Sequence, residues 1–161
     1  MRELLSLAER LEVTVQSAHL PRPYRGFYDH ERRRIVYDFT LAPVERACVL
    51  AHELGHAYHG HHGRQDAGAE READAFAAEV LIDPERLATL EAMGLCATDI
   101  AEELGVTSRL LRIFAEDHPV CSHGGTRTRL RTRPRVILEA KACSPLTAAL
   151  AGRGAGRNGP A

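Results

Sequence analysis

The sequence lacks several features that would assign the protein to a class at once. Its four cysteines, Cys48, Cys96, Cys121 and Cys143, form no CxxC pair, which excludes a zinc ribbon and a dithiol redox motif. No run approaches the roughly 18 apolar residues of a membrane-spanning helix, and charges interrupt the apolar residues at the N-terminus, so no signal-peptide core is visible. A formal net charge of -1 gives no general attraction to nucleic acid or membrane. We therefore expect a cytoplasmic protein with reduced thiols.

At 161 residues the chain is long enough to bury one core without help from disulfides. Helical spacing of apolar residues predicts helices over 3–11, 43–58, 69–82 and 85–93, and two short helices on either side of Gly105. Aromatic and β-branched runs at 24–28 and 35–39 predict an antiparallel hairpin, preceded by an extended segment at 13–20. Side chains that can cap these helices are Asp83, Thr98 or Asp99, and Thr107.

Residues 51–62 read AHELGHAYHGHH, with five histidines in eleven positions. His52 and His56 are four residues apart on the expected helix, so their imidazoles project from one face and can reach one metal ion. Glu53 lies about 100° round the helix from His52, where a carboxylate can take a proton from a water on that ion. HELGH therefore matches the HExxH pattern of zinc hydrolases. The alternative interpretation is a solvated polar helix face.

A catalytic zinc site needs a third protein ligand, and the sequence offers two. In the metzincin pattern HExxHxxGxxH the ligand would be His62, but that pattern needs glycine at position 59, where this chain has His59, and Gly60 comes one position late. The other option is Glu70, at the start of the next expected helix. Asp74 lies on the same face one turn later and can accept the second ring N–H of a ligand histidine, which fixes its tautomer. Without a metal, both acids would be solvated charges.

HELGHAYH at 52–59, followed by EREADAFAAEVLIDP at 70–84, resembles the ImmA/IrrE family of zinc metallopeptidases. The resemblance extends over about residues 24 to 115. This chain differs in having Ile82-Asp83 where the family often has methionine before the proline, and in its additional His61 and His62. The resemblance implies a zinc site whose ligands are His52, His56 and Glu70. It also implies that Glu53 is the catalytic residue and that Asp74 supports the ligands from outside the site.

The resemblance also implies a fold and a substrate. We expect an α+β, mainly helical zincin-like domain over 1–125, with a small antiparallel sheet beside the HExxH helix and a helix-turn-helix-like pair at 98–116. An arginine-rich segment and a flexible glycine-rich tail are expected over 126–161. Family members typically cleave helix-turn-helix repressors of stress-response or mobile-element genes, so such a repressor is the implied substrate of a gluzincin-type endopeptidase. Manganese can replace zinc, because affinity order alone does not set metal occupancy.

Three further histidines of the run are expected to lie off the ion. His59 is another helical turn away, too far to ligate, and should pack nearby, whereas His61 and His62 are expected to be exposed loop residues. An oxyanion donor is also needed, and the sequence leaves open Tyr28, Tyr37, His118 and His123. The hairpin offers an edge strand to which an extended peptide substrate can add.

A rival function rests on residues 97–118, ATDIAEELGVTSRLLRIFAEDH, which resemble a helix-turn-helix. If this segment reads DNA, Arg109 and Arg112 would face a major groove. Phosphate contacts would then come from the alternating arginines Arg127, Arg129 and Arg131. Acidic residues on both helices argue against DNA binding: Glu102, Glu103, Glu116 and Asp117. The rival is a DNA- or protein-binding regulator with a structural metal site, which would have no need of Glu53.

Overall fold

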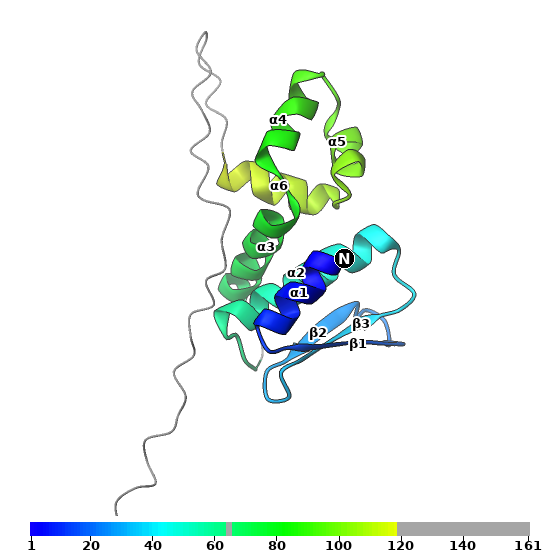
Figure 1. The fold of residues 1–161 in the computed structure, drawn as a ribbon, viewed down its shortest axis with the longest axis vertical. Coiled ribbons are helices and arrows are strands. Elements are labelled where there is room, and N and C mark those ends of the chain that lie inside the picture. The colour runs from blue at the N-terminus through cyan, green and yellow to red at the C-terminus, as the bar shows by residue number, and fades with distance from the viewer. Residues whose placement is uncertain (64–65, 119–161) are drawn as a thin grey trace, which may run out of the picture.

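A computed structural model of the protein describes residues 1–63 and 66–118, which form six helices and a three-stranded sheet (Figure 1). The elements in chain order are α1 (Arg2–Arg10), β1 (Thr14–Ala18), β2 (Gly26–Asp29), β3 (Arg34–Asp38), α2 (Pro43–His59), α3 (Ala67–Leu81), α4 (Pro84–Ala92), α5 (Ala97–Leu104) and α6 (Ser108–Asp117). The predicted α+β class, mainly helical with a small sheet, is confirmed. The predicted arginine-rich segment and tail at 126–161 lie outside the described residues.

The sheet has the strand order β1-β3-β2. The predicted hairpin is present, because β2 and β3 pair antiparallel with Tyr28 opposite Ile35. β1, however, pairs with β3 in parallel, from Thr14 opposite Arg34 to Ala18 opposite Asp38. The sheet is therefore mixed, and the prediction of an antiparallel sheet was wrong in this respect. The chain reverses before β2 and again before β3, so β3 returns in the direction of β1 and enters between the two earlier strands.

Helices α1 and α2 lie on one side of this sheet, and α2 contacts both β2 and β3 (Figure 1). Leu50 and Leu54 of α2 and Ile35 of β3 are fully buried between these layers. α2 begins at Pro43, which suits a first helical position because it has no N–H to leave unpaired. It ends where Gly60 adopts a left-handed conformation, with φ of +70°, which glycine reaches without steric cost.

The remaining helices continue from α3, which packs against both α2 and α6. Asp83 and Thr107 cap α4 and α6 as predicted, by accepting backbone N–H groups of the first turn. The prediction that Thr98 or Asp99 caps α5 was wrong. That helix begins after Cys96, which makes no side-chain cap bond, so both residues already lie inside its first turn. No helix in the described part of the chain has the length and apolarity needed to cross a bilayer.

Candidate metal centre

The two histidines of the HELGH stretch meet at one point on α2. The Nε2 atoms of His52 and His56 lie 3.1 Å apart, and their rings are nearly perpendicular, at 82°. Both side chains are shielded from solvent, with 16% and 5% of their surface exposed. The four-residue spacing thus places two ring nitrogens side by side on one helix face, as expected from helical geometry.

Glu70 supplies the third group, from the first turn of α3. One of its carboxylate oxygens lies 3.3 Å from His52 Nε2 and the other lies 3.6 Å from His56 Nε2. The N-terminus of α3 is set by Asp66, whose carboxylate accepts hydrogen bonds from the N–H groups of Gly68 and Ala69, both at 2.9 Å. These three residues, His52, His56 and Glu70, can hold a metal ion.

A glycine in the motif allows the two helices to approach this closely. A methyl group on Gly55 would lie 2.8 Å from Ala73 Cα and 2.9 Å from the Ala73 carbonyl oxygen. The backbones of α2 and α3 are therefore in contact at this point. Because Ala73 follows Glu70 by one helical turn, the contact brings the Glu70 carboxylate to the two imidazoles.

The alternative third ligand, His62, lies elsewhere. Its Nδ1 is 3.4 Å from the Gly60 carbonyl oxygen, and its ring lies 5.5 Å from that of His30. Within residues 1–63 and 66–118, the group of possible ligands that includes both HELGH histidines contains Glu70 and not His62. α2 continues through position 59, where the metzincin pattern would break it, and so the chain turns one residue too late for that geometry.

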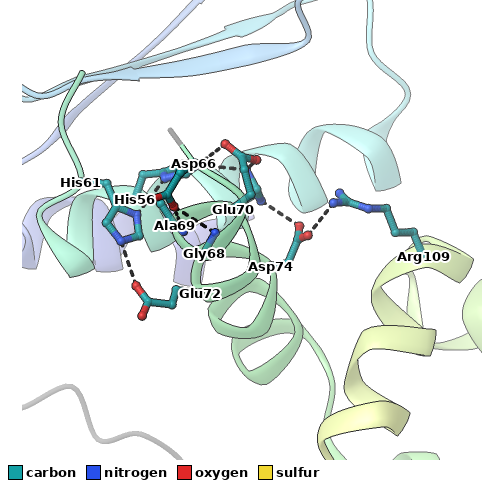
Figure 2. A network of polar contacts seen from close by, with 10 residues as sticks. His56, His61, Asp66, Gly68, Ala69, Glu70, Glu72, Asp74 and Arg109 are labelled. Atoms are coloured by element: carbon teal, nitrogen blue, oxygen red, sulfur yellow. Dashed lines mark hydrogen bonds and ion pairs between the residues drawn. The ribbon is translucent and has the colours of Figure 1, made fainter. Parts of the chain in front are cut away.

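Asp74 makes the predicted contact with a histidine of the motif. Its Oδ1 accepts a hydrogen bond from His52 Nδ1 at 2.9 Å, and its Oδ2 accepts one from the guanidinium of Arg109 on α6. Figure 2 shows Asp74 between the candidate metal ligands and Arg109. Burial lowers the pKa of His52, but the Asp74 hydrogen bond and the neighbouring carboxylate charges outweigh burial and raise that pKa above its ordinary value.

His56 has the opposite electrostatic environment. Burial, together with the neighbouring His52 and His61, lowers the pKa of His56 to about 4. Its imidazole is therefore neutral at pH 7 and retains a lone pair, which is the form that binds metals.

Glu53 is 8% exposed and lies outside the group of possible ligands. Burial raises its pKa to about 7, and Glu70 adds to this effect, whereas His52 and a hydrogen bond from the Tyr28 backbone lower the pKa. A carboxylate with a pKa close to the working pH can both accept and return a proton. Glu53, next to His52 in the sequence, is therefore a buried carboxylate with a pKa near neutral beside the candidate metal ligands.

Two predictions about the other histidines have different outcomes. His59 packs as predicted, with its ring 6.2 Å from that of Phe76. His61 lies in the loop after α2 as predicted, but the prediction that it is exposed was wrong, because its Nδ1 lies 3.0 Å from His56 Nδ1 and only 14% of its side chain is exposed. The other ring nitrogen of His61 donates a hydrogen bond to the carboxylate of Glu72 on α3. The glycine at position 60, which favours a reversal of the chain, was the signal that could have indicated these contacts.

The two arginines proposed to read DNA have other partners. Arg109 donates to Asp74, and Arg112 forms an exposed ion pair with Glu116 at 3.8 Å. Of the candidate oxyanion donors, Tyr37 contacts Arg46 and His118 stacks on Phe114. Four predicted residues, Arg127, Arg129, Arg131 and His123, lie outside the described residues.

Tyr28, the remaining candidate, lies on β2, which contacts α2. Its hydroxyl is buried and has no hydrogen-bond partner among the described residues. Its backbone N–H donates to Glu53. The strand therefore contacts the candidate base through its main chain.

The chain matches one family model among known protein families. The family model described as the IrrE N-terminal-like domain, Peptidase_M78, matches residues 8–115. This range contains the HELGH stretch, Glu70, Asp74, α5 and most of α6. No curated protein matches the chain significantly.

Proposed function

The chain belongs to the peptidase family defined by the IrrE N-terminal-like domain, and on this basis we propose that it is a zinc-dependent endopeptidase of the gluzincin type. His52, His56 and Glu70 bind the zinc ion, and Glu53 is the catalytic residue. The observation that carries the proposal is the convergence of three ligand atoms from α2 and α3 beside a buried carboxylate.

The spacing of the ligand atoms fits zinc. Ligand atoms bound at about 2.0 to 2.2 Å around a tetrahedral ion lie about 3.3 to 3.6 Å from one another. The separations from the two histidines to Glu70, 3.3 and 3.6 Å, lie in this range, and the separation between the histidines, 3.1 Å, is slightly shorter. Two imidazoles and one carboxylate also match the ligand set of zinc hydrolases that keep a fourth position open. Manganese remains an alternative occupant in the cell.

A bound zinc ion would polarise the scissile carbonyl and lower the pKa of a coordinated water toward about 7. Glu53 would accept a proton on a carboxylate oxygen as the attacking water bonds to the carbonyl carbon, and would return that proton to the amine as the peptide C–N bond breaks. Its raised pKa, about 7, suits both transfers at neutral pH. The hydrogen bond from the Tyr28 backbone lowers this pKa and so favours the ionised form of Glu53, which is the form that accepts a proton.

The proposed substrate is a helix-turn-helix repressor of stress-response or mobile-element genes. Support for this comes from the family resemblance alone. β2 is an edge strand of the sheet and contacts α2, so an extended peptide that pairs with its free edge would lie near Glu53. Binding of this kind uses main-chain hydrogen bonds and makes little demand on the substrate sequence.

The ligand set is tested by the metal content of purified proteins, measured by elemental analysis after mild chelation. We expect wild type, Glu53→Gln and the control His62→Ala to retain one zinc ion, and Glu70→Ala to lose it. If His62→Ala lost zinc and Glu70→Ala retained it, the third zinc ligand would be His62 and not Glu70. Absence of metal from wild type would overturn the enzyme proposal and favour a regulator that acts through α5 and α6.

Catalysis is tested with the zinc-loaded proteins and a purified repressor, with fragments identified by mass spectrometry. We expect wild type to cleave, and Glu53→Gln to retain zinc while its rate falls about 100- to 10,000-fold, the usual contribution of a general base. Cleavage by loaded Glu53→Gln at the wild-type rate would exclude Glu53 as the base.

A further inference from the structure

His61 forms a hydrogen-bonded chain with two other residues at the metal centre. Its Nδ1 lies 3.0 Å from His56 Nδ1, and its Nε2 lies 3.0 Å from a carboxylate oxygen of Glu72 (Figure 2). His61 thus connects a proposed zinc ligand on α2 with an acidic side chain on α3. The zinc ligands assigned above do not include it.

The end of α2 holds His61 in this position. Gly60 takes up the left-handed conformation and reverses the chain. The His61 N–H then donates to the His56 carbonyl oxygen at 2.9 Å, and the Gly60 N–H donates to that of Ala57 at 3.3 Å, which is the bonding of a Schellman motif. The ring of His59 stacks on that of His61, with 15° between the planes. Backbone and ring contacts therefore both direct His61 toward His56.

The two facing Nδ1 atoms can form a hydrogen bond only if one of them carries a proton and the other does not. His56 Nε2 faces His52 and Glu70, so it is the nitrogen that would bind zinc, and the neutral ring then carries its proton on Nδ1. His61 Nδ1 must therefore be unprotonated and accept the hydrogen bond from His56 Nδ1–H. His61 in turn carries its own proton on Nε2, from which it donates to Glu72.

We propose that His61, backed by Glu72, is a positioning residue that holds His56 in the Nδ1–H tautomer with Nε2 directed at the zinc ion. This inference rests on the proposed zinc site. It gives the two histidine ligands separate supports, since Asp74 performs the same task for His52. Outer partners of this kind orient the ligand ring and increase its basicity.

Zinc affinity, measured by competition with a chromophoric chelator, tests the proposal in the full-length protein. His61→Phe keeps a ring beside His59 but removes the acceptor, so we expect affinity to fall about 10- to 100-fold. His61→Asn places an amide oxygen near the former Nδ1 position and should recover affinity to within a few-fold of wild type. His62→Ala, one residue away and without a contact to His56 in the described structure, is the matched control and should bind as wild type does.

Histidine tautomers give a second readout that packing alone would not change. In long-range proton–nitrogen spectra of zinc-loaded wild type, we expect a proton on Nδ1 of His56 and on Nε2 of His61. Wild-type affinity in His61→Phe, or a proton on His61 Nδ1, would overturn this proposal and leave the zinc site intact. Failure of wild type to bind zinc would overturn both proposals.

Discussion

The substitution Gly55→Ala tests whether the contact between α2 and α3 sets the geometry of the metal centre. The new methyl group would lie 2.8 Å from Ala73 Cα and 2.9 Å from the Ala73 carbonyl oxygen, whereas non-bonded carbon atoms are normally about 3.5 to 4.0 Å apart. Both contacted atoms belong to the backbone, so no change of rotamer relieves the clash. We therefore expect α3 to move away from α2 by about 0.7 to 1.2 Å.

Glu70 lies one turn before Ala73 and would move with it. Its oxygens now lie 3.3 Å from His52 Nε2 and 3.6 Å from His56 Nε2, and the shift would lengthen these separations to about 4 Å or more, beyond the range for a tetrahedral zinc site. Removal of an outer partner of a zinc ligand typically lowers affinity about 10- to 100-fold. Because this substitution displaces a ligand itself, we expect zinc affinity to fall at least about 10-fold.

The fold itself should survive this substitution. Overpacking costs about 1 to 3 kcal/mol, and alanine in place of glycine inside a helix recovers about 0.8 to 1.0 kcal/mol, so the free energy of unfolding should fall by about 0 to 2 kcal/mol. Chelator competition and thermal unfolding with and without zinc measure the two effects. The control is Gly68→Ala, whose methyl group would approach a side-chain oxygen of Asp66, at 3.2 Å, and not the backbone of another helix. Unchanged zinc affinity in Gly55→Ala would refute the reasoning.

Two further predictions concern buried carboxylates. Arg109→Ala removes one of the two partners of Asp74. Because this arginine is 60% exposed, we expect zinc affinity to fall less than about 10-fold and to stay unchanged in the control Arg112→Ala. An equal fall in both variants would contradict a specific role of Arg109 and show a general effect of charge on α6. Asp38 has a pKa lowered to about 2, first by the Thr40 hydroxyl and then by backbone N–H groups, so its ionised form stabilises the fold above about pH 4, and this contribution is lost as the pH falls toward 2. Asp38→Asn should therefore lower stability at pH 7 and flatten the loss between pH 4 and 2 in denaturant titrations, and an unchanged acid limb would contradict this.

Local features of the centre could be predicted from the sequence, because they depend on residues within one or two helical turns. The four-residue step from His52 to His56 predicts two nitrogens on one face of any regular helix. The same reasoning links Glu70 to Asp74 and explains why Asp83 and Thr107 cap their helices. The helices and the hairpin were predictable for this reason, since periodicity and caps are local properties of the chain.

The contacts between separate elements were decided only by the tertiary structure. Glu70 and His62 were both open as the third ligand, and it is Glu70 that the structure brings to the two histidines, because α3 approaches α2 closely at Gly55. Arg109 reaches Asp74 across 35 positions of sequence, and no local pattern distinguishes that use of an arginine from DNA binding.

The direction of β1 and the position of His61 show the same limit. The strand pattern of β1 is identical for parallel and antiparallel neighbours, so only the path of the chain through β2 determines how it pairs. The sequence predicted an exposed His61 because its partners are brought to it only by the reversal at Gly60 and by the packing of α3. The sequence by itself determined which side chains share a helix face, and the packing of the helices determined which faces meet.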